Sequence, residues 1–173
     1  KPETKDVTAS MLGARFRSNE QNDLKRKSIV TSLGGSATWF DLDGDGDLDL
    51  FWVSATEQHL YRNDGGKLTD VTAASGALAK VNGLNVGAVA GDYDNDGLND
   101  VYLARHGPNQ LWRQTAKGKW QDVTEQTKTY GGNFETVGGA FFDADHDGDL
   151  DLFLVNENAP NELLNNDGNG TFR

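Results

Sequence analysis

Cysteine is absent from the 173-residue chain. Neither a disulfide framework nor a thiolate metal site can therefore form, and cysteine usage gives no indication of the redox compartment. Long apolar runs are missing too, because stretches such as residues 50–53 and 152–155 are far shorter than the roughly 20 residues that a membrane-spanning helix needs. We therefore expect no insertion into a membrane.

Basic residues are few relative to acidic ones. The chain has 16 lysines and arginines against 27 aspartates and glutamates, which gives a formal net charge of -11 at pH 7. This charge repels the phosphate backbone of nucleic acids, so we expect no nucleic-acid partner. The hydrophobic content of 36% is nevertheless sufficient for a core in a chain of this length, which excludes a disordered acidic tail.

Sequence signatures of catalysis are also lacking. The chain has no nucleophile elbow, no phosphate-binding glycine loop and no dinucleotide fingerprint. His59, His106 and His146 lack the spacing of a zinc pair, and we expect them at the surface or in turns. Acidic residues outside the aspartate-rich loops form no evident catalytic pair. We therefore expect that this chain is not an enzyme.

An aspartate-rich stretch of nine residues occurs three times, and successive copies begin 51 residues apart. The copies are residues 41–49, 92–100 and 143–151. Short segments with period-two alternation flank each copy, and a second hairpin pattern follows it, as in residues 60–68 and 111–120. Four short strands in about 50 residues are typical of a β-propeller blade, so the sequence predicts an all-β repeat protein.

Residues 15–32 are the main exception to this period, because they are charged and only weakly apolar. We expect them to form a surface insertion in which residues 20–27 make a short helix. The rest of the chain follows the period, so residues 1–173 are expected to form a single repeat region.

Aspartate occupies positions 1, 3, 5 and 9 of every copy, and glycine occupies position 6. Alternate residues of a tight loop can direct carboxylates toward one centre, where Ca²⁺ takes six to eight oxygen ligands at about 2.3–2.6 Å. Gly46, Gly97 and Gly148 permit the sharp turn, and position 7 would present its backbone carbonyl. Carboxylates this close would repel one another without a cation. The sequence therefore predicts three Ca²⁺ sites.

The pattern differs from an EF-hand, whose loop needs a bidentate glutamate at position 12. Trp52, Leu103 and Leu154 occupy that position here. Position 9 instead lies where the following strand begins, so the ion should connect strand ends rather than helices. The predicted role of the ions is therefore mainly structural.

Residues 86–103 and 60–72 resemble the FG-GAP or VCBS-type repeats of integrin alpha-subunit propellers and of the ASPIC/UnbV group, which includes cartilage acidic protein. The resemblance extends over nearly the whole chain and implies blades of four antiparallel strands, with the calcium loop between the first two. It also implies a ligand set for each loop, made of four aspartate side chains and the carbonyl of position 7. Carried over by position, these ligands are Asp41, Asp43, Asp45, Asp47 and Asp49; Asp92, Asp94, Asp96, Leu98 and Asp100; and Asp143, Asp145, Asp147, Asp149 and Asp151.

Closed propellers usually have about four to eight blades, whereas this chain has three periods. We expect either a stretch of a longer propeller, seven-bladed by resemblance, or self-association that covers the apolar blade faces. The chain begins at Lys1 without a charged and apolar leader, which favours a mature secreted product or an excised segment. Because weak oxygen-ligand sites suit millimolar extracellular calcium, we expect a secreted, cell-surface or periplasmic protein.

Three functions are compatible with these features. The preferred hypothesis is a calcium-binding extracellular scaffold that binds a protein or a glycan through the loops on one propeller face. The alternatives are an accessory, non-catalytic domain of a larger extracellular polysaccharide-acting enzyme and a structural subunit of a surface assembly or filament. The tryptophans lie in predicted strands, where we expect them to pack between blades, with a sugar platform as the alternative. They are Trp39, Trp52, Trp112 and Trp120.

Overall fold

The computed structural model describes residues 35–80, 83–132 and 134–173, which form antiparallel sheets with little helix. The expected insertion at residues 15–32, with its helix, lies outside these described residues. The strands are β1 (Ser36–Phe40), β2 (Asp49–Val53), β3 (Gln58–Asn63), β4 (Leu68–Asp70), β5 (Leu84–Gly91), β6 (Asp100–His106), β7 (Gln110–Ala116), β8 (Lys119–Asp122), β9 (Glu135–Phe142), β10 (Asp151–Glu157) and β11 (Glu162–Leu164). The helical segments are the 3-10 helix η1 (Thr72–Ala79) and the single turn α3 (Thr124–Thr127).

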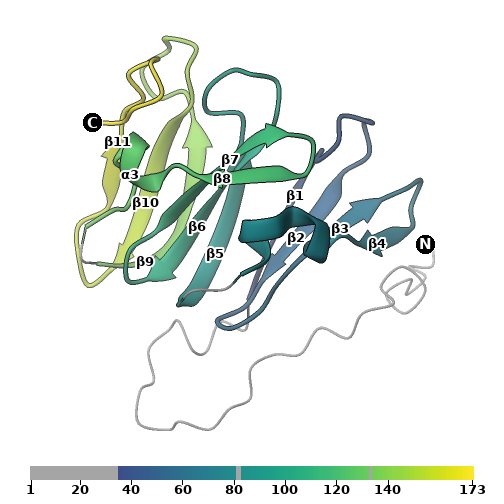
Figure 1. Ribbon diagram of the computed structural model, residues 1–173. Coiled ribbons are helices and arrows are strands. Elements are labelled where there is room, and N and C mark those ends of the chain that lie inside the picture. Colours follow the sequence, from purple (N-terminus) through teal and green to yellow (C-terminus); the bar gives the residue numbers. More distant parts are fainter. Residues whose placement is uncertain (1–34, 81–82, 133) are drawn as a thin grey trace, which may run out of the picture.

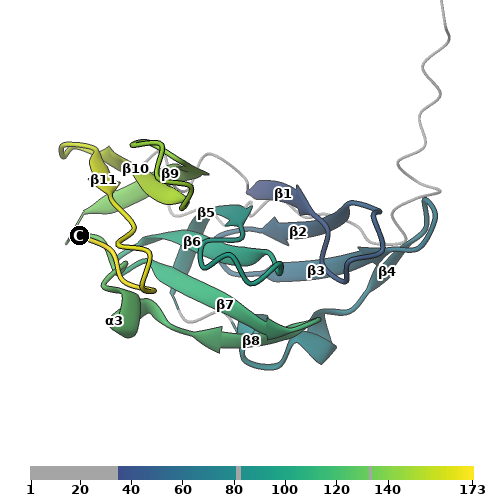
Figure 2. The same ribbon diagram turned by 90° about the horizontal axis from the view of Figure 1, so that it is seen from above.

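The strands follow one another along the chain as three blades, and one pairing of β6 with β9 joins the second and third blades into a seven-stranded sheet (Figure 1). Blade 1 contains β1–β4, blade 2 contains β5–β8 and blade 3 contains β9–β11, and consecutive strands within each blade pair antiparallel. The first strands β1, β5 and β9 lie next to one another. Blade 1 therefore lies at one end of the row and blade 3 at the other (Figure 2). This arrangement confirms the predicted all-β repeat architecture.

Cross-strand pairing accounts for the period-two alternation. In blade 1, Phe51 of β2 lies opposite Thr38 of β1 and opposite Leu60 of β3. Phe51 and Val53 belong to the apolar cluster between blades 1 and 2, whereas Trp52 between them does not, because successive side chains point to opposite faces of a strand. By the same alternation β6 of the middle blade serves two blade interfaces, because Val101 and Leu103 face one cluster and Tyr102 faces the other.

Two apolar clusters fill the spaces between blades. The cluster between blades 1 and 2 contains Phe40, Leu42, Phe51, Val53, Leu60, Leu78, Ala88, Val101, Leu103 and Trp112. The cluster between blades 2 and 3 contains Tyr93, Tyr102, Leu111, Val123, Leu152, Leu154 and Phe172. Burial of these residues between blades, rather than within one sheet, holds the three repeats together.

The tryptophans divide into two groups. Trp112 belongs to the first cluster, and Trp120 packs against that cluster with its ring edge-on to Phe40 at a centroid distance of 6.4 Å. The expected packing between blades is confirmed for these two. Trp39 is 51% exposed on β1, and the partly buried Trp52 lies against the His59 ring.

No helix in the described part of the chain is long and apolar enough to cross a bilayer.

Candidate metal centres

The three aspartate-rich loops connect β1 to β2, β5 to β6 and β9 to β10, and they lie along one edge of the molecule, at the top of Figure 1. The position 6 glycines have positive φ angles between 85° and 96°, as predicted. Position 4 also has positive φ, at 73° for Gly44, 59° for Asn95 and 65° for His146. Two left-handed residues in each loop curl the backbone so that its carboxylates converge.

Each loop brings together one oxygen from each of three aspartates, and the three oxygens lie within 4.8 Å of one another. The first and third loops use positions 1, 3 and 9, and the second uses positions 1, 3 and 5. These groups are Asp41, Asp43 and Asp49; Asp92, Asp94 and Asp96; and Asp143, Asp145 and Asp151. Carboxylates at such separations repel one another, and a hard cation would offset that repulsion.

The aspartate at position 9 also ties its loop to a later part of the same blade. Asp49 is fully buried, and its two oxygens accept hydrogen bonds from the backbone N–H groups of Leu42 at 2.6 Å and Asn63 at 2.7 Å. Asp100 and Asp151 accept the same pair of backbone bonds. Burial raises the pKa of Asp49, and it raises the pKa of Asp100 to about 7. Charge on these groups therefore needs a compensating partner.

Two buried carboxylate oxygens at position 3 have no hydrogen-bond partner among the described residues. Oδ1 of Asp43 and Oδ1 of Asp94 are inaccessible to solvent, and neither accepts a hydrogen bond from the described residues. A buried oxygen left in this state costs free energy, whereas a bound cation would satisfy it. In the third loop Asp145 is exposed, and a hydrogen bond of 2.8 Å from Asn165 lowers its pKa. The donor sets of the first two loops therefore fit a hard cation best.

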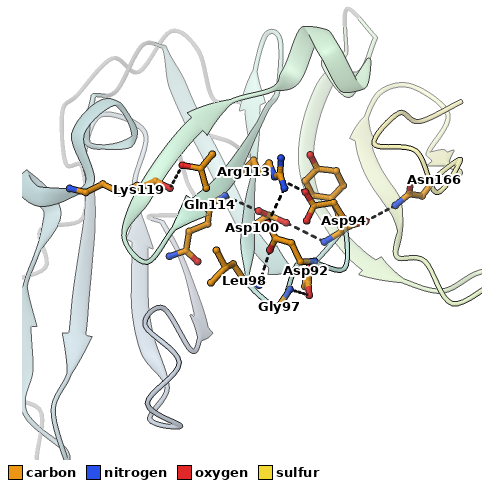
Figure 3. Close-up of polar contacts among 12 residues, drawn as sticks. Asp92, Asp94, Gly97, Leu98, Asp100, Arg113, Gln114, Lys119 and Asn166 are labelled. Atoms are coloured by element: carbon orange, nitrogen blue, oxygen red, sulfur yellow. Dashed lines mark hydrogen bonds and ion pairs between the residues drawn. The ribbon is translucent and has the colours of Figure 1, made fainter.

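The second loop has an arginine beside it (Figure 3). Nε of Arg113 lies 2.5 Å from Oδ2 of Asp94, and its Nη2 lies 2.9 Å from Oδ2 of Asp96. Burial still raises the pKa of Asp94, although Arg113 opposes this shift. Arg62 occupies the corresponding place in blade 1, but it pairs with Asp64 instead. The second loop thus has an arginine ion-paired to two of its carboxylates, whereas within the described residues no carboxylate of the first loop is in an ion pair.

Amide side chains join the first and second loops to the blades that follow them. Nε2 of Gln114 donates to the carbonyl of Leu42 at 2.9 Å, and Nδ2 of Asn166 donates to the carbonyl of Tyr93 at 2.8 Å. Leu42 and Tyr93 hold position 2 of their loops, and their N–H groups donate to the position 9 carboxylates. The backbone N–H groups of Gln114 and Asn166 donate to Asp100 and to the position 9 carboxylate of the third loop. One run of hydrogen bonds therefore joins all three loops.

Two overlapping stretches of the chain, residues 41–103 and 92–154, match the model of the FG-GAP-like repeat. Each stretch begins at the first aspartate of one loop and continues through the next loop into the following strand. The chain belongs to the FG-GAP-like repeat family. Its matched residues cover more than half of the 173-residue sequence, and they include all three loops. A comparison with curated proteins gives no match.

The FG-GAP-like pattern predicted side-chain ligands at positions 1, 3, 5 and 9. Positions 1 and 3 come together in every loop, whereas Asp45, Asp100 and Asp147 lie outside the three-residue groups. The carbonyl ligands at position 7 remain predictions. The side chains there are engaged elsewhere, since Asp47 accepts a hydrogen bond from the N–H of Gly65 at 2.8 Å and Asp149 accepts one from Asn95 at 2.7 Å.

Sequence reasoning missed Arg113, Gln114 and Asn166. A signal was present, because each belongs to the phrase that follows every FG-GAP-like loop and begins at Leu60, Leu111 and Leu163. The third residue of this phrase, Arg113 in blade 2 and Asn165 in blade 3, contacts the acidic loop of its own blade. The fourth residue, Gln114 or Asn166, contacts the loop of the preceding blade.

Proposed function

We propose that this chain is a calcium-stabilised extracellular scaffold of β-propeller type that binds a protein or a glycan. The observation that carries the calcium assignment is the buried, unpartnered Oδ1 atom of Asp43 and of Asp94, each within a group of converging carboxylates. Membership of the FG-GAP-like repeat family supports the extracellular location, because such repeats are typical of extracellular proteins.

In this proposal the carboxylates at positions 1, 3, 5 and 9 and the carbonyl at position 7 hold one Ca²⁺ in each loop. Three ions would change the formal charge from -11 to -5 and so reduce the repulsion within and between the loops. The ion supplies only charge and coordination. The position 9 carboxylates and the inter-blade amides are hydrogen-bonded to the blades, so a loop that the ion fixes also stabilises the blades around it.

A cavity of about 470 Å³ between blades 2 and 3 supports a polar ligand. It lies beside the second loop and is lined by Arg113, Asn95, Gln121, Gln126 and Asn169, among other residues. Amide side chains offer both donors and acceptors, as sugar hydroxyls require. The cavity therefore favours a glycan over an apolar ligand.

We further propose that the role is binding rather than catalysis. Among the described residues, the carboxylates that converge are those of the loops, and their repetition suits three ions better than a single reaction centre.

The calcium proposal is tested by stripping the protein with a chelator and titrating Ca²⁺ back by calorimetry, while thermal unfolding is followed in parallel. We expect up to three ions per chain and a large rise in melting temperature, because a ligand at 100 times its Kd stabilises the native state by about 2.7 kcal/mol per site. Mg²⁺ at equal ionic strength is the control. The absence of binding, or binding without stabilisation, would refute the proposal.

The glycan proposal is tested on a glycan array with the calcium-loaded protein and with Gln126→Ala, which alters the cavity and leaves the loops intact. Binding that Gln126→Ala weakens supports the cavity as the site. Binding that the substitution leaves unchanged would place the glycan elsewhere, and an array without any bound glycan would favour a protein partner.

A further inference from the structure

Arg105, near the end of β6, is a buried cation without a charge partner among the described residues. It is 8% exposed, and its Nε is inaccessible to solvent and makes no hydrogen bond within residues 35–80, 83–132 and 134–173. None of the ion pairs in this part of the chain includes Arg105. Arg113 on the neighbouring β7 is more exposed, and yet it is paired with two aspartates. Because an arginine stays charged and its burial costs free energy, Arg105 lacks the anion that would offset this cost.

The backbone around Arg105 gives its side chain a fixed place. The N–H of Arg105 donates to Oδ1 of Asn109 at 2.8 Å, and Nδ2 of Asn109 donates to Oγ1 of Thr136 in β9 at 2.8 Å. Asn109 and Thr136 are each 1% exposed, so the turn from β6 to β7 is anchored inside the protein. Before β5, a Cβ at Gly83 would clash with Nη2 of Arg105. The guanidinium is therefore packed against the backbone rather than extended into solvent.

A cavity of about 280 Å³ lies beside Arg105. It is formed by the turn from β6 to β7, by α3 with the residues next to it, and by Tyr130. Because β6 begins at the second aspartate-rich loop and ends at this turn, the cavity lies about 20 Å along the strand from that loop. Among the described residues, only Gln126 lines both this cavity and the one between blades 2 and 3. The two cavities are therefore separate sites, and Arg105 belongs to one of them.

The other side chains of the cavity indicate the class of ligand. Burial lowers the pKa of Arg105, and the charge of Asp122 offsets this shift only in part. Asp122 and Glu125 both line the cavity, so a bare inorganic anion would be repelled, whereas the hydroxyl groups of a sugar could donate to their carboxylates. The ring of Tyr130, which is 47% exposed, offers an apolar face to a sugar ring. A ligand that combines one carboxylate with several hydroxyl groups fits this set best.

We propose that the cavity beside Arg105 binds a uronic acid unit of an acidic glycan. Arg105 donates two parallel N–H bonds to the sugar carboxylate, which is the strongest geometry for such a pair. Glu125 accepts from a sugar hydroxyl, and the Tyr130 ring lies against the sugar ring. The volume is near the lower end of ligand pockets, about 300–1,000 Å³, and so suits a single sugar unit. This site is additional to the cavity between blades 2 and 3, and it includes none of the proposed calcium ligands.

The test is calorimetric titration of the calcium-loaded chain with glucuronate, and with glucose as the neutral sugar of the same ring size. We expect glucuronate to bind at least about tenfold more tightly than glucose, because charge-assisted hydrogen bonds are about twice as strong as neutral ones. Arg105→Met should weaken glucuronate binding at least about tenfold. Lys119→Met is the matched control and should leave this affinity unchanged, because it removes the same charge from an exposed position of β8 outside the cavity.

Thermal unfolding of Arg105→Met without sugar separates a ligand-binding role from a structural one. An apolar side chain in place of an unpaired buried charge should maintain or raise the melting temperature, whereas loss of a structural contact would lower it. If Arg105→Met is destabilised, Arg105→Lys and Tyr130→Ala take its place. Arg105→Lys keeps the charge but loses the planar fork, and Tyr130→Ala loses the ring, so each should still weaken glucuronate binding severalfold.

Three results would overturn the proposal. They are a natural chain that does not bind glucuronate, binding that the variants leave unchanged, and binding of N-acetylglycine as tight as that of glucuronate. N-acetylglycine carries its carboxylate on a peptide unit, so the last result would assign the cavity to the carboxyl terminus of a peptide. Calcium titration of Arg105→Met should match that of the natural chain. Failure at Arg105 is therefore distinguishable from failure of the calcium proposal, and it leaves the cavity between blades 2 and 3 to its own test.

Discussion

We expect Asp49→Asn and Asp43→Asn, which change the same chemical group in one loop, to differ in their effect on stability in the absence of calcium. Asp49 accepts two backbone hydrogen bonds while fully buried. Asparagine has one carbonyl oxygen, so its NH₂ group would face one of the two N–H donors and leave it unsatisfied. An unsatisfied buried donor costs about 1–3 kcal/mol. The neutral amide avoids the burial cost that raises the pKa of Asp49, which offsets part of this loss. Without calcium we therefore expect the free energy of unfolding to fall by about 1–2 kcal/mol, which lowers the melting temperature by about 2–8 °C.

Asp43→Asn should behave differently. Oδ1 of Asp43 accepts no hydrogen bond from the described residues, so the substitution removes no such bond there. In chelator we expect stability within about 0.5 kcal/mol of the natural chain. With calcium present the first loop should contribute nothing, which removes about 2.7 kcal/mol when calcium is at 100 times the Kd of that site.

The assay is thermal unfolding of both variants in chelator and in saturating calcium, with calorimetry to count the ions bound. Equal losses for the two variants in chelator would refute the distinction between Asp49, which holds the scaffold as well as the proposed ion, and Asp43, which holds the proposed ion alone. So would a calcium-dependent gain in Asp43→Asn equal to that of the natural chain.

The remaining predictions concern the second and third loops. Arg113→Ala should tighten calcium binding at the second loop by removing a competing cation. Arg62→Ala should change the affinity of the first loop less in the same calorimetric titration, because Arg62 pairs with Asp64 outside that loop. Asn166→Leu should lower the free energy of unfolding by about 1–3 kcal/mol, because it leaves the buried carbonyl of Tyr93 without its donor, and denaturant unfolding measures this loss. His146→Val should destabilise by about 1–2 kcal/mol because a β-branched residue resists the φ of 65° there, and His146→Gly should not.

The local features of this fold could be predicted from sequence because they depend on residues close together in the chain. The convergence of Asp41 and Asp43 follows from alternate spacing in a loop that Gly46 allows to turn. The strands on either side follow from period-two alternation, and their pairing follows from the shortness of the loop. Nothing beyond one period is needed for these inferences.

The exposure of equivalent residues could not be predicted in this way. Phe40 and Phe142 hold the same position in the repeat, yet one is 4% exposed and the other 42%. Blade 2 packs against Phe40, whereas no blade of the described residues packs against Phe142. The second role of Asp49 was missed for a related reason, because the N–H of Asn63 reaches it only through the register of β2 and β3.

Position 2 is the residue through which ion binding and blade packing are coupled. Tyr93 donates its N–H to Asp100 in its own blade, accepts from Asn166 of the next blade, and packs its ring against Phe172 at a centroid distance of 5.8 Å. A cation that fixes the loop from Asp92 to Asp100 therefore also fixes the peptide groups and the ring that contact blade 3. Because repeats of this kind gain much of their stability from nearest-neighbour interfaces, a metal held within one blade contributes to the cohesion of two.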